Sequence, residues 1–351
     1  MSIPIIIKPD EPSAQLSSML AAIISAGSFE ITGYQDELRD FRDRKLVLAV
    51  ELDPAGNSPE TYGFISRLFQ SDPYALSGSS AMVLIHSPNE LNTKSNASNI
   101  LFQLNQLGCR FFGHPVVEAT GSLHNFLTWQ KTIDRPLEDI CGEICRSSAS
   151  LFLNSVSPKH DKPNLLVLHS SAMETSNTLA LWGMVKKHLH GCDIAEFHVE
   201  NGKVLDCIGC SFKTCIHFSS RKSCFYGGTM VEHIYPAIEK ADSIIWLCPN
   251  YNDSVSANLM AVINRMTALY RRTPFYTKSF FSVIVSGNSG GDSVAKQLID
   301  SLCINKGFIL PPRTALFATA NNPGAIYGIP GIDKSAEIFA ANILGEIKSD
   351  S

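Results

Sequence analysis

Hydroxyl side chains gather in one short stretch of the chain, His169-Ser170-Ser171-Ala172-Met173-Glu174-Thr175-Ser176-Asn177-Thr178. The apolar run at 165–168 precedes it and is typical of a buried parallel strand. A helical pattern follows, with apolar side chains three or four residues apart over 179–189. Backbone amides and hydroxyls at a helix N-terminus bind anions, and the helix dipole favours negative charge there. The stretch therefore predicts a site for a terminal phosphate monoester.

Two common nucleotide-binding loops are excluded at this position. No Lys follows the loop, so it is not the loop of a nucleoside-triphosphate-binding enzyme. No GxGxxG motif is present, which excludes the dinucleotide-binding turn. The short loop suits one phosphate group, as in FMN, and we expect FMN rather than FAD.

Two further polar loops follow predicted strands, at 249–254 and at 286–291. The carboxyl ends of parallel strands share one sheet edge, so these loops should meet the first one there. A flat ring needs amides at its polar edge, an aromatic or proline over one face, and glycines for close approach. A larger residue at Gly290 should then block the ring and leave the fold intact. The candidate cofactor-binding residues are Ser170, Ser171, Ser176, Asn177, Thr178, Pro249, Asn250, Tyr251, Asn252, Asp253, Ser254, Ser286, Gly287, Asn288, Ser289, Gly290 and Gly291.

Beyond residue 163, strand and helix patterns alternate regularly, which predicts a parallel sheet with helices on both faces. Ligands of such sheets bind beyond the strand carboxyl ends, where the strand order reverses. Strands are expected at 164–169, 193–199, 243–248, 280–286 and 314–319, and helices at 176–190, 229–240, 256–271 and 292–305.

The first half is a less regular α/β segment. The polar stretch 154–163, with two prolines, is the best linker. We therefore expect two domains, a degenerate α/β domain over 1–158 that has lost its ligand and a ligand-binding domain over 159–351. In the first domain, strands are expected at 45–52 and 81–86, and helices at 58–70, 95–107 and 139–153.

Over about residues 165–325, the three loops resemble those of the NADPH-dependent FMN reductase and iron-sulfur flavoprotein branch of the flavodoxin-like superfamily. In that family the first loop reads roughly S-P-x-x-x-S-N-T and holds the FMN phosphate. The second reads P-x-Y before a helix that ends in D-R, and the third is glycine-rich. The chain departs from this pattern at Ser171, where Pro is usual, and at Asn264, which stands in place of the Asp.

This resemblance implies a flavodoxin-like five-stranded fold and an FMN-dependent oxidoreductase. NAD(P)H would give a hydride to the flavin, and electrons would pass to an acceptor that the sequence does not identify. Since the cofactor carries the redox chemistry, no acid/base pair is needed, and no catalytic side chain is assigned. The resemblance also implies a homo-oligomer, at least a dimer, with a small-molecule or protein acceptor as partner.

Cysteines form the second unusual feature, since four of the ten lie between 207 and 224. Their spacing is stretched relative to the cysteine loop of the cluster-binding family members. Thiolates at Cys207, Cys210, Cys215 and Cys224 would hold a [4Fe-4S] cluster, or zinc less readily, because zinc sites usually pair two short C-x2-C motifs. The alternative function is then an electron-transfer protein of the iron-sulfur flavoprotein type. Ordinary loop thiols are the competing interpretation, and a non-catalytic flavin-binding or scaffolding protein is a third function.

The composition narrows the partners. The chain has 29 basic and 33 acidic residues and no basic block, which argues against nucleic acid and anionic membranes. No apolar run reaches transmembrane length, and the N-terminus lacks a signal-peptide pattern. We therefore expect a cytoplasmic protein. Two further residues are expected to be structural: Cys248, inside a predicted strand, as a core residue, and Arg265 as the partner of a nearby carboxylate.

Overall fold

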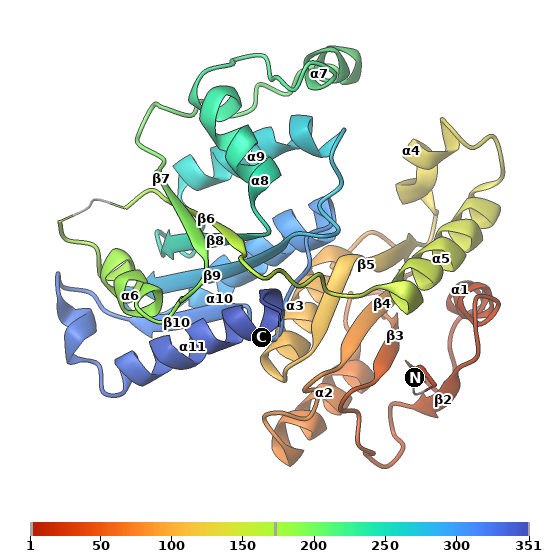
Figure 1. Ribbon diagram of the computed structural model, residues 1–351. Coiled ribbons are helices and arrows are strands. Elements are labelled where there is room, and N and C mark those ends of the chain that lie inside the picture. Colours follow the sequence, from red (N-terminus) through yellow and green to blue (C-terminus); the bar gives the residue numbers. More distant parts are fainter. Residues whose placement is uncertain (1–2, 172–173, 350–351) are drawn as a thin grey trace. The chain divides into compact units, whose positions relative to one another are not determined.

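The computed structural model describes residues 3–171 and 174–349. The chain divides into two compact units, Met1–Val156 and Ser157–Ser351, so the division falls inside the polar stretch 154–163. Each unit is an α/β structure built on its own five-stranded sheet (Figure 1). Within the described residues, no helix is long and apolar enough to cross a membrane.

The second unit contains one fully parallel sheet in the order β10-β9-β8-β6-β7. Read from the β7 edge and numbered within the unit, this order is 2-1-3-4-5, the flavodoxin-like order. The fold predicted from the sequence is therefore confirmed. The strands are β6 (Asn164–His169), β7 (Asp193–His198), β8 (Ser243–Pro249), β9 (Ser279–Ser286) and β10 (Ala315–Thr319).

Helices cover both faces of this sheet (Figure 1). Two of them, α6 and α11, cover one face, where Trp182 and Phe339 pack against Ile245 and Phe281. The central strands β8 and β9 are almost entirely buried, which explains their continuous apolar sequences. The helices are α6 (Asn177–Lys186), α7 (Phe212–Ser219), α8 (Tyr235–Lys240), α9 (Ala257–Tyr270), α10 (Gly291–Leu298) and α11 (Ile332–Ile347), with shorter turns η2 (Met230–Ile234), η3 (Ile299–Ile304) and η4 (Ala325–Gly328).

Helix α11 was not predicted, although its sequence carries the signal. Ile332, Ala336, Phe339 and Ile343 are three or four residues apart, and all are buried against the sheet. The helix closes the face that α6 covers only in part. The predicted helices at 229–240 and 292–305 exist but contain π-helical turns, at η2 and at η3.

The first unit repeats the same topology, with the parallel order β2-β1-β3-β4-β5. The expectation of a second α/β domain is thus confirmed, and its fold is flavodoxin-like as well. Its strands are β1 (Ile5–Lys8), β2 (Glu30–Gly33), β3 (Lys45–Glu51), β4 (Ser80–Ser87) and β5 (Arg110–Thr120), and its helices are α1 (Ala14–Ile24), α2 (Pro59–Ser71), α3 (Thr93–Gln106), η1 (His124–Phe126), α4 (Leu127–Gln130) and α5 (Leu137–Asn154).

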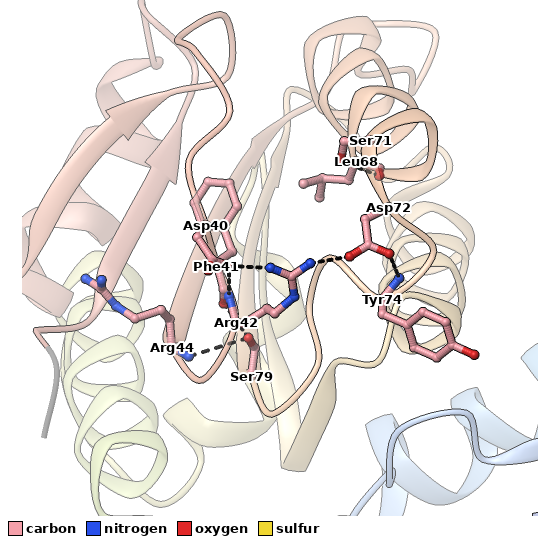
Figure 2. Close-up of polar contacts among 9 residues, drawn as sticks. All are labelled: Asp40, Phe41, Arg42, Arg44, Leu68, Ser71, Asp72, Tyr74 and Ser79. Atoms are coloured by element: carbon pink, nitrogen blue, oxygen red, sulfur yellow. Dashed lines mark hydrogen bonds and ion pairs between the residues drawn. The ribbon is translucent and has the colours of Figure 1, made fainter.

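Polar contacts hold the segment that leads into β3 (Figure 2). Arg42 forms ion pairs with Asp72, at the end of α2, and with Asp40 at 3.3 Å. The Ser79 hydroxyl donates to the Phe41 carbonyl at 2.5 Å. These contacts lie where β3 and β4 begin, so they stabilise the edge of the first sheet opposite to the strand carboxyl ends.

Candidate functional site

The three predicted loops of the second unit follow adjacent strands, β6, β8 and β9. The strand order reverses between β6 and β8, because the chain goes from β6 to one side and returns to the other. The loops after these two strands are joined by a hydrogen bond of 2.6 Å between the Ser170 and Ser256 hydroxyls. Ser256, the N-cap of α9, was not among the predicted site residues, although a serine at a predicted helix start is a recognisable capping signal.

Ser171 carries the clearest sign of a missing partner. Its side chain is 2% exposed, and its hydroxyl oxygen has no hydrogen-bond partner in the described part of the chain. Leaving a buried hydroxyl unpaired costs about 1–3 kcal/mol. A ligand oxygen in the loop would remove this cost, so Ser171 fits a phosphate group. The next two residues of the predicted loop, 172–173, lie outside the described residues.

The start of α6 supplies further donors. Ser176 is the N-cap, and its oxygen accepts from the Leu179 amide at 3.3 Å. Its hydroxyl hydrogen therefore remains able to donate to an anion. Thr178 is buried in the first turn of the helix.

Asn177 has a different role, since its side chain binds protein groups. Its amide nitrogen donates to the carbonyls of Ala320 at 3.1 Å and Asn322 at 2.8 Å, and its oxygen accepts from the Ile326 amide at 3.4 Å. The residue fixes the start of α6 to the loop after β10. We therefore assign Asn177 to positioning of the loop.

Asn250 joins the second loop to the third. Its side-chain nitrogen donates to Asp253 Oδ1 at 3.1 Å, to the Ser286 hydroxyl at 3.2 Å and to the Ser289 carbonyl at 2.7 Å. Its side-chain oxygen is buried and has no partner among the described residues. That oxygen is an acceptor that a ligand N–H group can satisfy.

Tyr251 lies at the tip of the second loop with its side chain 55% exposed. The next two residues, Asn252 and Asp253, have left-handed backbones with φ of 53° and 56°. This tight turn follows Pro249, the last residue of β8. The loop therefore presents an exposed aromatic side chain beside the sheet edge, as a flat ligand would require.

Gly290 is required by the loop itself. Its φ is 83°, and a Cβ atom built there would lie 1.7 Å from Asp253 Oδ1 and 3.0 Å from the Asn250 side-chain nitrogen. A larger residue at Gly290 should therefore strain the loop itself as well as block the ring. A side chain at Gly290 would separate the second and third loops. Near the same turn, the Asn288 side chain accepts from the Ser289 amide at 2.7 Å, and Gly291 begins α10.

Within the described residues, the structure gives no support for a metal site at the four cysteines. Among the described residues, no group of three or more His, Cys, Asp and Glu side chains is arranged to hold a metal ion. Cys207 is exposed, and its sulfur accepts from the Gly209 amide at 3.4 Å. Cys215 lies on α7, where its sulfur contacts Arg271 Nε at 3.3 Å. The prediction of a cluster at Cys207, Cys210, Cys215 and Cys224 therefore has no support in the structure, because the wide spacing disperses the thiols over a loop and a helix.

Arg265 is structural, as expected, but its partners are carbonyls. Its side chain is 2% exposed and donates to the Gly227 carbonyl at 2.9 Å and to the Leu205 carbonyl at 3.5 Å. The preceding Asn264 donates to Asp206 at 2.9 Å. The Asn-Arg pair thus fastens the cysteine-containing segment to α9.

Two other sequence candidates are packing residues. The rings of His169 and His198 stack with centroids 4.9 Å apart. Burial, together with the neighbouring His198, lowers the pKa of His169, so the imidazole is held neutral. Cys248 is fully buried, and burial raises the pKa of its thiol to about 12, as expected for a core residue.

The equivalent position in the first unit is filled by the protein itself. The loop after β1, residues 9–13, is Pro-Asp-Glu-Pro-Ser and ends at Ser13, the N-cap of α1. The Ser13 amide donates to Glu51 Oε2 at 3.1 Å, and the other oxygen of Glu51 lies 2.5 Å from His86 Nδ1. A carboxylate thus occupies the helix N-terminus, and the two acidic residues in the loop would repel a phosphate.

Comparison with known proteins agrees with this geometry. Residues 163–322 match the family model NADPH-dependent FMN reductase. No curated protein matches the chain significantly in sequence. Similar solved structures include RosB with a bound 8-demethyl-8-formylriboflavin-5′-phosphate intermediate (14% identity, 52% of this chain and 81% of that chain, TM-score 0.39). The NAD(P)H:quinone oxidoreductase of Methanothermobacter marburgensis is also similar (14% identity, 53% of this chain and 96% of that chain, TM-score 0.36). So is the flavodoxin, WrbA-like protein of Agrobacterium tumefaciens (13% identity, 52% of this chain and 96% of that chain, TM-score 0.35). The family match lies within the second unit, over the residues that carry the three loops.

Proposed function

We propose that this chain, whose residues 163–322 match the NADPH-dependent FMN reductase family, binds one FMN in its second unit and passes electrons from NAD(P)H to a second acceptor. The observation that carries the proposal is the unpaired, buried hydroxyl of Ser171 in the loop where the strand order reverses. Neither a dinucleotide-binding glycine motif nor a phosphate-binding lysine is present to favour another nucleotide.

The residues of the three loops have separate roles in this proposal. Ser171, Ser176 and the amides at the start of α6 would hold the phosphate. Asn250 holds the second and third loops together and would offer its free oxygen to the polar edge of the ring. The exposed Tyr251 would cover part of the ring. When bound, FMN supplies the hydride-accepting and electron-donating chemistry, so the protein contributes position and electrostatics.

The acceptor is proposed by chemical class. A quinone, an enoate, an azo or nitro compound, or another protein would fit a flavin that is reached from the sheet edge. We also propose a homodimer at least, because closed two-fold pairing is the commonest arrangement of oligomers.

The test is chemical analysis of the cofactor followed by a redox assay. Flavin released by denaturing the purified protein is identified by reversed-phase chromatography, and NADH and NADPH oxidation is then measured with each acceptor class. FMN together with acceptor-dependent NAD(P)H oxidation supports the proposal. FAD, or a protein that cannot be loaded with flavin, contradicts it.

The electron-transfer alternative depends on iron. Protein purified without air and analysed for iron and for visible absorbance separates the two functions, since a cluster adds a broad shoulder to the flavin bands. Protein that contains no iron and still oxidises NAD(P)H would support the reductase function and contradict the electron-transfer alternative. Bound flavin with no NAD(P)H oxidation favours the scaffolding function.

A further inference from the structure

An open groove lies at the edge of the second sheet where the strands begin. Its walls come from α7, from the last turn of α9 and from the segments that lead into β9 and β10. Helix α7 packs beside α9 (Figure 1). The flavin loops follow the strand carboxyl ends, so the groove lies at the opposite edge from them. Its volume is about 780 Å³, enough for a ligand of nucleotide size.

Positive side chains line this groove, and no acidic residue does. Arg272 donates to the carbonyls of Ser220 at 3.0 Å and Ser219 at 3.4 Å. Arg271 contacts the sulfur of Cys215. Within residues 3–171 and 174–349, neither arginine forms an ion pair with a carboxylate. The groove therefore holds positive charge that the protein leaves without a counter-charge.

Lys306 is a buried cation in the wall of the groove. Its side chain is 8% exposed, and Nζ donates to the Ser301 carbonyl at 3.4 Å. Burial lowers the pKa of this lysine to about 8, and no carboxylate opposes the effect. A buried cation without an anion destabilises the folded protein, so an anion from solution would relieve the cost.

An aromatic wall stands beside these cations. The guanidinium group of Arg271 lies 4.6 Å from the centroid of the Phe212 ring, which is 64% exposed. Tyr276, on the segment before β9, is also exposed and lines the groove. Exposed aromatic rings next to arginine are suited to stack on a flat heterocycle.

We propose that this groove binds a phosphorylated aromatic compound of the nucleotide class. Arg272 and Lys306 would hold its phosphate, and its ring would lie on the wall formed by Phe212 and Tyr276. The site is separate from the flavin loops and does not depend on the activity proposed for them.

The experiment is calorimetric titration of the full chain, dialysed free of unbound flavin, with AMP, ADP, adenosine and inorganic phosphate as separate probes. AMP or ADP should bind with one site per chain, more tightly than phosphate, and adenosine should bind least. Arg272→Gln and Lys306→Met should each weaken AMP binding roughly tenfold or more, because each removes a charge-assisted hydrogen bond. Phe212→Ser alters an exposed side chain and should weaken AMP but not phosphate. Lys334→Met, on α11, is the matched control and should change nothing.

Several results would overturn the proposal. They are no binding of AMP or ADP at millimolar concentration, equal binding of adenosine, or binding that both Arg272→Gln and Lys306→Met leave unchanged. Binding of an acidic peptide with no binding of AMP would assign the groove to a protein partner instead. Thermal unfolding of each variant confirms that it is folded.

Discussion

The Ser13 amide donates a hydrogen bond of 3.1 Å to the Glu51 carboxylate, at the N-terminus of the helix that follows the first strand of the first unit. The corresponding helix start in the second unit follows Ser171, a residue whose buried hydroxyl has no partner in the described chain. The two units share a strand order but differ at this position. In the first unit the Glu51 carboxylate lies at the helix start, whereas in the second unit the Ser171 hydroxyl is free to bind a ligand.

We expect one FMN per chain. The Glu51 carboxylate accepts from the Ser13 amide at the start of α1, and like charge repels a phosphate. Flavin absorbance after denaturation, divided by protein concentration from amino-acid analysis, measures the ratio. Ser13→Ala should leave the flavin content unchanged. A ratio of two would contradict the assignment of the first unit.

Ser171→Ala should weaken FMN binding by roughly 10- to 100-fold, because a hydrogen bond to a charged phosphate is worth about 1.5–3 kcal/mol. Flavin fluorescence quenching measures the dissociation constant. Ser282→Ala is the matched control, since that hydroxyl is equally buried at 1% exposure and also lacks a partner, but it lies within β9. Equal effects of the two substitutions would remove Ser171 from the phosphate site.

Gly290→Ala should destabilise the protein more than Gly331→Ala. Both glycines are helix N-caps with left-handed backbones, with φ of 83° and 76°. A Cβ at Gly331 meets open space, whereas one at Gly290 meets Asp253 and Asn250. The extra cost of displacing these side chains is about 1–3 kcal/mol, read from denaturant unfolding. Similar free energies of unfolding for both variants would show that the loop contacts contribute little.

Lys306→Met should stabilise the protein at neutral pH. The pKa of Lys306 falls from 10.5 to about 8 on folding, so between these values the unfolded chain binds more protons and stability rises with pH. The loss of folding free energy caused by burying the charged Lys306 is largest below about pH 8, at about 3 kcal/mol. It disappears above pH 10.5, the pKa of the unfolded chain. Denaturant unfolding of wild type and variant, in buffers without phosphate or nucleotide, gives the difference. A difference that does not shrink at high pH would argue against a buried, charged lysine.

Local sequence was sufficient for the second sheet. Strands β6, β8 and β9 are apolar runs, and β6 matches its predicted bounds, because a buried parallel strand requires a continuous apolar sequence. The polar loops after β6, β8 and β9 could be placed at one edge because parallel strands all end on the same side. Helix α11 was missed although its apolar spacing is regular, and the first unit was predicted only as a degenerate α/β segment.

Tertiary structure decided which of these residues have partners. The burial of the Ser171 hydroxyl, the role of Asn250 in joining two loops and the dispersal of the cysteines depend on groups far apart in sequence. The same holds for Glu51, which reaches a helix start 38 residues away, and for the groove around Lys306. The sequence alone determined the elements and the polar loops, since hydrophobic periodicity and turn chemistry are local. Hydrogen-bond satisfaction and charge compensation are properties of the folded neighbourhood, so only the tertiary structure decided them.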